Sequence, residues 1–457
     1  MKAVFLIHRT SVYRYLTPVI RESLKRGHTV ECWHDYSQPK YGVKAYAFAH
    51  LEHAPDFGDL GNPSKKTFCG KIDMIEKLAS DPEIDVVFAP SSFHHFLPGV
   101  RLDRFSFEWA TVMAGFDNFH EFREAHPPLE GDRRQLFFAH SETMLEKGRA
   151  FLNKFSPDRA SNLDDRFIDI RVVGMAECDT FRDVESDLEI RAKYKIPNDK
   201  PVLLYLPFPY FNLNKNSAWE RAFYGYFTNT KKTNDHAYIH DRKKNVLSNV
   251  LFKTWCLYNI LKDPVGRDCF FRGITIEKIF QAVRDFCDKN GLYLVIKPRL
   301  KNPLSEIEKR KSDLIVWDDE TQQDPPVLKE LLAISRLSMS YSSTAIRESV
   351  FANVFHLNIT LPEIFNPSEE INYWYSPEEG WMFNSPGIGI SQTIEECIEN
   401  LRDLSLEELK MDAAAKAQFI KKFSGFEDYS TSRRILDIVE EKVRSRQVST
   451  EAGKVIL

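Results

Sequence analysis

The sequence predicts an α/β fold built from two doubly wound domains and completed by C-terminal helices. Apolar strands alternate with amphipathic helices over short joints, and this alternation starts again after a polar, proline-containing segment at residues 196–200. A chain of 457 residues has room for two large domains of this kind. We place an N-terminal domain at residues 1–190, a second domain at 191–425, and a helix with a tail at 426–457.

The first domain opens with a strand, a helix and a second strand. Residues 3–7 are continuously apolar, and residues 14–26 carry apolar side chains at helical spacing before Gly27 ends the helix. The next strand follows at residues 29–33, so the three elements predict a right-handed parallel crossover. Further strands are predicted at residues 84–89, 109–113, 136–139 and 168–173.

The second domain repeats this pattern from a buried strand at residues 201–207. Residues 210–272 form an insertion in which aromatic residues precede a basic run. The rings of this insertion either pack on the domain or form a platform for an acceptor or a membrane surface. The later elements expected are helices at 276–289, 327–334, 344–352, 393–404, 406–422 and 429–444, strands at 292–297, 314–317 and 337–340, and a disordered last dozen residues.

Composition excludes several classes of protein. The 62 Lys and Arg residues are balanced by 66 Asp and Glu residues, so no overall positive charge favours nucleic acid, and we expect no nucleic-acid partner. The seven cysteines are scattered without a C-x-x-C pair, which is typical of a reducing cytoplasm. No apolar run approaches the ~20 residues that span a bilayer. We expect a cytoplasmic protein, with any membrane contact peripheral at the inner face.

Familiar catalytic motifs are missing from the sequence. It contains neither a phosphate-binding G-x-x-x-x-G-K-[ST] loop nor a G-x-G-x-x-G turn after a strand. The H-E-x-x-H and G-x-S-x-G patterns are absent as well. No Asp-x-Asp pair is present, although that pattern holds the metal ion in another large class of sugar transferases. We therefore expect no catalytic metal and no organic cofactor.

Residues of the second domain form a candidate phosphate site. The strand that ends in Lys297-Pro-Arg299 offers positive charge, and Ser342-Ser-Thr344 leads from another strand into a helix. Hydroxyls and free backbone N–H groups at a helix start suit a phosphate, although such a run also serves as a plain N-cap. Glu348, about one turn further, is placed to accept hydrogen bonds from a ribose. The predicted donor-binding residues are Lys297, Arg299, Ser342, Ser343, Thr344 and Glu348.

The stretch at residues 335–357 resembles the donor-binding "DYSS…E" element of the CDP-glycerol glycerophosphotransferases and related GT-B glycosyltransferases. Residues 173–179 are similar to the family's "GNPxxD" turn, residues 203–207 to "ILYAPT" and residues 294–298 to "LIKPHP". Bacterial transferases that use CMP-activated Kdo or sialic acid carry similar elements. The resemblance implies a GT-B fold, in which two Rossmann-like domains face each other across a cleft, and a nucleotide-activated sugar donor. It also implies a glycan or glycolipid acceptor from a bacterial surface polysaccharide.

The sequence departs from the family pattern at three places. Arg299 follows Pro298 where the family has His-Pro, and Ser340 replaces the Asp of "DYSS". Ala114-Gly115 aligns with the "HG" turn whose His is the family's base. Another base is therefore required, and the loops after the strands of the first domain offer candidates, among them His8 and Asp35 after the first two strands. The predicted catalytic residues are Asp117, which follows that turn and is our first choice, and the adjacent His94 and His95.

Together these observations predict a metal-independent glycosyltransferase. It would move a sugar from a nucleotide-activated donor, of CMP or CDP type, to a hydroxyl of a surface-polysaccharide or glycolipid acceptor. Three alternatives stay open from the sequence: a UDP-GlcNAc 2-epimerase-like enzyme, a CDP-glycerol-type polyol-phosphate transferase, and a non-catalytic binding protein on a transferase fold.

Overall fold

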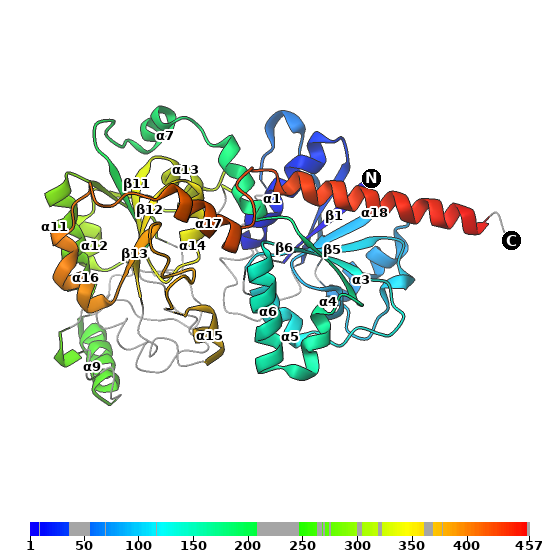
Figure 1. Cartoon of the computed structure of the whole chain (residues 1–457), viewed down its shortest axis with the longest axis horizontal. Helices are drawn as coiled ribbons and strands as arrows, with labels where there is room; N and C mark the ends of the chain where they lie inside the picture. The colour runs from blue at the N-terminus through cyan, green and yellow to red at the C-terminus, as the bar shows by residue number, and fades with distance from the viewer. Residues whose placement is uncertain are drawn as a thin grey trace. The chain divides into compact units, whose positions relative to one another are not determined.

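The chain divides into two compact units, each built around one parallel sheet (Figure 1). The first unit comprises residues 1–183, 320–326 and 420–457, and the second comprises residues 184–319 and 327–419. The two sheets and their flanking helices confirm the predicted doubly wound α/β class. This computed structural model describes residues 1–8, 10–35, 55–68, 70–115, 117–207, 246–262, 267, 270–273, 276–298, 304–318, 322–360, 369–376 and 378–454.

The first unit contains a seven-stranded sheet in the order β3-β2-β1-β4-β5-β6-β7. All its strand pairs are parallel, and the chain reverses its direction of travel across the sheet between β1 and β4. The strands are β1 Lys2–Ile7, β2 Thr29–Asp35, β3 Ser64–Phe68, β4 Val86–Ala89, β5 Glu108–Val112, β6 Gln135–Ala139 and β7 Ile168–Val172. The helices include α1 Tyr13–Lys25, α3 Lys71–Ser80, α4 Phe93–Phe96, α5 Asp117–Glu124, α6 Glu142–Phe155 and α18 Thr431–Lys454.

Helix α18 belongs to the first unit because its apolar face completes that unit's core. Ile435, Leu436 and Val439 are fully buried in one cluster with residues of α1 and the central strands. The burial of such side chains stabilises the fold by roughly 1.5–3 kcal/mol each. The helix continues to Lys454, so the predicted disorder of the last dozen residues is wrong for residues 446–454.

The second unit contains a six-stranded parallel sheet in the order β10-β9-β8-β11-β12-β13. Its strands are β8 Val202–Tyr205, β9 Tyr293–Ile296, β10 Leu314–Ile315, β11 Ser335–Tyr341, β12 Phe355–Ile359 and β13 Gly389–Gln392. Its helices include α7 Asp187–Tyr194, α9 Val246–Lys262, α11 Ile276–Asn290, α12 Glu306–Lys311, α13 Val327–Ala333, α14 Ala345–Phe351, α15 Glu369–Trp374 and α16 Ile394–Asn400. Helix α17, Ala413–Phe423, follows them.

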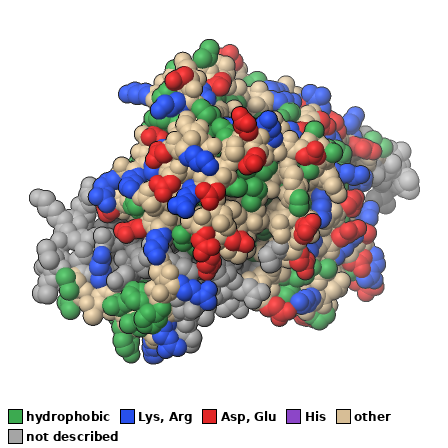
Figure 2. Space-filling model, turned by 60° about the vertical axis from the view of Figure 1, so that its left-hand side comes forward, with side chains coloured by type: hydrophobic (Ala, Val, Ile, Leu, Met, Phe, Trp, Pro, Cys, Tyr) green, Lys and Arg blue, Asp and Glu red, His purple; other side chains and the backbone are tan. Residues whose placement is uncertain are grey.

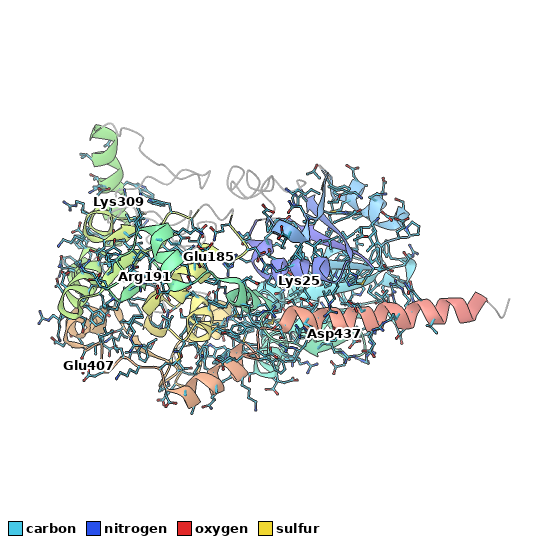
Figure 3. The ribbon with its side chains drawn as sticks, turned by 90° about the horizontal axis from the view of Figure 1, so that it is seen from above. Lys25, Glu185, Arg191, Lys309, Glu407 and Asp437 are labelled. Atoms are coloured by element: carbon cyan, nitrogen blue, oxygen red, sulfur yellow. The ribbon has the colours of Figure 1, made fainter. Side chains whose placement is uncertain are left out.

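One face of this sheet packs against α11 and α16, and the amino ends of its strands are tied to α7. The core on that face includes Phe280 and Val283 of α11 and Cys397 of α16. Arg191 of α7, labelled in Figure 3, donates hydrogen bonds to the carbonyl oxygens of Lys200 and Ile334. These two residues lie just before β8 and β11, so Arg191 holds the start of both strands.

Three strands escaped the sequence prediction. The edge strand β3, with the sequence SKKTF, is too polar to resemble a buried strand, and lysines are typical of edges that must not pair further. Strand β12 overlaps the end of the donor element at residues 335–357, and it was therefore not predicted as a separate strand. Strand β13 is short and opens at Gly389, where a Cβ atom would lie 2.2 Å from the carbonyl oxygen of His356. That close approach requires glycine.

Candidate functional site

The carboxyl edge of the six-stranded sheet gathers polar residues from several strands. Tyr205 pairs with both Ile296 and Met339, so these residues define one row across β8, β9 and β11. The residues one step further along the strands form the edge: Lys297, Ser340, Asn358 and Ser391. The strand order reverses between β8 and β11. In doubly wound sheets ligands bind beside the carboxyl ends at such a reversal.

Asn358 fixes the backbone of the predicted phosphate loop. Its Oδ1 accepts a hydrogen bond from the backbone N–H of Ser342 at 2.9 Å. Its Nδ2 donates to the carbonyl oxygen of Phe383 at 3.0 Å and to Ser391 Oγ at 2.9 Å. Ser342 has a φ of 42°, in the left-handed region that serine rarely adopts. Asn358 was not among the residues predicted from the sequence, although an amide near the end of an otherwise apolar strand was a usable signal.

The hydroxyl run at residues 342–344 is distributed around the start of α14. Ser343 Oγ accepts a hydrogen bond from the backbone N–H of Ala345 at 3.3 Å. Thr344 stands at the N-cap in helical conformation, and its side chain makes no capping hydrogen bond. The hydroxyl that supports the turn therefore comes from Ser343, one position earlier than an ordinary N-cap.

A buried histidine links the two strands beneath this loop. The ring of His356 lies between two hydroxyls, with Nδ1 at 2.8 Å from Ser338 Oγ and Nε2 at 2.9 Å from Ser340 Oγ. Burial lowers the pKa of His356 to about 3, so the ring is neutral at pH 7. Ser340 occupies the position at which the resembled family has Asp. Its hydrogen bond with His356 thus connects β11 to β12.

Lys297 lies at the same edge of the sheet as Ser342. Its backbone N–H donates to the carbonyl oxygen of Tyr205, and its Nζ lies 2.7 Å from Asp318 Oδ2. One strand, β8, separates β9 from β11, which places the two strand ends about 10 Å apart at ordinary strand spacing. Both partners of the ion pair are largely buried. Arg299, the second predicted cation, lies outside the described residues.

Glu348 is held by a lysine of the neighbouring helix. Its Oε1 lies 2.6 Å from Lys329 Nζ, and the two side chains are 3% and 1% exposed. The ion pair joins α13 to α14 in the interior of the unit. The predicted contact between Glu348 and a ribose would have to share a carboxylate that already binds Lys329.

In the first unit, the predicted histidines lie over a face of the sheet. They belong to the short helix α4, where the backbone N–H of Phe93 donates to Gln135 Oε1 at 2.7 Å. Gln135 is the first residue of β6, so α4 has turned back from the carboxyl end of β4 toward the amino ends of its neighbours. His94 is buried and His95 is half-buried, and burial lowers the pKa of both rings.

Asp117 begins α5, directly after the turn that follows β5. Its neighbour Asn118 fixes this turn: Oδ1 accepts from the backbone N–H of Ala114 at 2.7 Å, and Nδ2 donates to the carbonyl oxygen of Pro90 at 2.8 Å. Asn118 thereby joins the segments that follow β4 and β5, and it was not among the residues predicted from the sequence. The side chain of Asp117 lies outside the described residues. Its backbone is nevertheless fixed at the carboxyl end of β5.

Within the described ranges, no three His, Cys, Asp or Glu side chains converge as metal ligands would. Among the helices that the structure describes, none has both the length and the apolar composition to cross a bilayer.

Comparisons with known proteins identify the fold. No protein-family model matches the sequence, and no curated protein matches it. The wall teichoic acid polymerase TagF superposes with a TM-score of 0.52 at 11% identity, over 97% of this chain and 90% of that chain. A UDP-GlcNAc 2-epimerase from Methanocaldococcus jannaschii gives 0.47 at 13% identity, over 96% and 100%. The likeness to TagF confirms the predicted GT-B class of fold.

Proposed function

We propose that this chain is a glycosyltransferase that uses a nucleotide-activated sugar and binds it at the carboxyl edge of the six-stranded sheet. The observation that carries the proposal is the hydrogen bond from the backbone of Ser342 to Asn358, at the strand-order reversal where doubly wound folds bind ligands. The likeness of the whole fold to TagF supports a role in nucleotide-dependent transfer.

The donor's phosphate is proposed to lie between the loop at residues 342–344 and the end of β9. Lys297, whose Nζ also lies 2.7 Å from Asp318 Oδ2, would supply positive charge there, and Arg299 is proposed as a second cation from the sequence alone. As the bond between the sugar carbon and the phosphate oxygen breaks, negative charge grows on the phosphate. Fixed cations and dipoles that face such growing charge lower the barrier to reaction. We favour a cytidine nucleotide over a uridine nucleotide on the sequence resemblance.

Asp117 is proposed as the base on the acceptor side. It would take the proton of the acceptor hydroxyl, whose oxygen then forms the new bond to the sugar carbon. A correctly placed base contributes roughly 10²–10⁴-fold to the rate. The loop of Asp117 is held by Asn118, whereas His94 and His95 lie back over the face of the sheet.

The test is release of nucleotide from activated sugars. The protein is incubated with CMP-, CDP- and UDP-activated sugars and, separately, with CDP-glycerol, each with and without a mixture of glycan acceptors. Release that depends on an acceptor is the expected result. Formation of a sugar isomer from donor alone would instead establish an epimerase, and transfer only from CDP-glycerol would establish a polyol-phosphate transferase.

A further inference from the structure

Helix α9, Val246–Lys262, carries apolar side chains on two opposite faces. Cys256 and Ile260 are fully buried in the core of the second unit. At about 100° per residue, Leu251 and Tyr258 point to the opposite side of the helix. They are 62% and 63% exposed. The burial of one face therefore fixes the helix with its other apolar face toward solvent.

The exposed face forms a continuous stripe, which we call the α9 stripe. Figure 2 shows apolar side chains gathered in the region of α9, at the lower left of that view. Large apolar side chains that a chain leaves exposed side by side are typical of interaction surfaces. The members of the α9 stripe are Val250, Leu251, Trp255, Tyr258 and Leu261.

Two polar side chains beside the α9 stripe each donate one hydrogen bond to the backbone of the helix. Thr254 Oγ1 donates to the carbonyl oxygen of Val250 at 2.9 Å, and Asn259 Nδ2 donates to the carbonyl oxygen of Trp255 at 2.7 Å. These two donors keep their partners when the helix leaves water, because the accepting carbonyl oxygens belong to the same helix. The stripe can therefore enter an apolar environment without losing these two hydrogen bonds.

The charges of α9 are all positive. Residues 246–262 contain Lys253 and Lys262 and no Asp or Glu. Lys262 is exposed and ends the helix. A surface that combines apolar and aromatic side chains with cations complements an anionic lipid surface, where rings lie at the headgroups and cations meet phosphates.

We propose that the α9 stripe docks the protein on an anionic lipid bilayer, with α9 lying in the plane of the headgroups. A second copy of the chain fits less well. Five side chains, each about half exposed, offer on the order of 500 Å². A standard protein interface needs ~800 Å² from each partner. The proposal does not depend on the proposed sugar transfer. It also concerns a different part of the insertion from the aromatic and basic run of the sequence analysis, which lies outside the described residues.

The experiment is flotation of the full chain with vesicles, without nucleotide. One set of vesicles is phosphatidylcholine, and the other contains equal parts of phosphatidylcholine and phosphatidylglycerol. The test variant is Leu251→Glu with Tyr258→Glu, and the control is Leu188→Glu, because Leu188 of α7 is 67% exposed on the same unit. Lys262→Glu tests the charge without altering the apolar stripe. Circular dichroism and thermal unfolding verify that every variant is folded.

Wild type and Leu188→Glu should bind the anionic vesicles, and the double variant should bind them at least about tenfold more weakly. Lys262→Glu should weaken binding to the anionic vesicles more than to the neutral ones. Equal binding of the double variant and wild type would overturn the proposal, as would failure of wild type to bind. A dimer in light scattering that the double variant disperses, without vesicle binding, would assign the stripe to a second copy instead.

Discussion

Lys329 Nζ lies 2.6 Å from Glu348 Oε1, and both side chains are almost completely buried. A buried charge that loses its partner costs roughly 3–5 kcal/mol. We therefore expect Glu348→Gln to lower the free energy of unfolding of the second unit by that amount, measured by urea denaturation. The double variant Glu348→Gln with Lys329→Met should recover much of the loss, because no unpaired charge is left. Full stability of Glu348→Gln alone would contradict this account of the pair.

Asn358 should matter for both stability and nucleotide binding. Asn358→Ala removes the acceptor for the backbone N–H of Ser342 and the donor to Phe383, and unmade hydrogen bonds of this kind cost about 1–3 kcal/mol each. We expect a lower melting temperature and a weaker affinity for the nucleotide in titration calorimetry. Thr254→Ala, on α9, is the control. An unchanged affinity of Asn358→Ala for the nucleotide would show that Asn358 does not support the proposed site.

Glu308 should make stability depend on pH. Burial raises the pKa of its carboxyl to about 7, against hydrogen bonds from Ser305 that lower it. Between about pH 4.5 and pH 7 the folded state then holds a proton that the unfolded state has lost. The contribution of this group to stability therefore falls as pH rises through that window and is constant above it.

The measurement for Glu308 is urea unfolding of wild type and Glu308→Gln at several pH values. Glutamine keeps the capping geometry with Ser305 and cannot titrate. The difference in unfolding free energy between the two proteins should change by a few kcal/mol across the window, at about 1.36 kcal/mol per pKa unit. A difference that stays constant with pH would show that Glu308 titrates alike in both states.

Asp117 and the histidines of α4 should respond differently to substitution. Asp117→Asn should lower kcat by roughly 10²–10⁴-fold with little change in melting temperature, because it removes a base and keeps the shape. His95→Gln should leave kcat near that of wild type. A loss of kcat in His95→Gln, together with normal activity in Asp117→Asn, would contradict the proposal and would indicate that His95 is the base.

The sequence predicted the fold better than the site. Buried strands such as β1 and β8 are short, continuous apolar runs with clear boundaries. Helices such as α1 and α11 have apolar residues at regular helical spacing. These local patterns were sufficient to predict both kinds of element. The edge strand β3 carried no such signal because its side chains are polar. Local sequence patterns predict a strand from its buried apolar side chains. A strand at the edge of a sheet buries fewer side chains, so it shows a weaker pattern.

The candidate site depends on partners that are distant in the sequence. The resemblance pointed to Ser342 and Glu348, but the partners of these residues, Asn358 and Lys329, were found only from the fold. His95 follows a strand, as a catalytic loop residue should, yet its helix turns back over the sheet. The position of a residue after a strand predicts that its loop begins at the carboxyl edge of the sheet. It does not predict the direction that the chain takes after that point.

The most direct test of the central claim is a thermal-shift titration with CMP, CDP, UDP and GDP on wild type, Lys297→Met and Lys289→Met. Lys289 lies in the last turn of α11 and precedes β9, so it stands at the opposite edge of the sheet from Lys297. A ligand that binds only the folded state raises the melting temperature with its concentration. We predict a rise for wild type and Lys289→Met with at least one cytidine nucleotide, and its loss in Lys297→Met. No rise with any nucleotide, or an equal rise in all three proteins, would contradict donor binding at this edge.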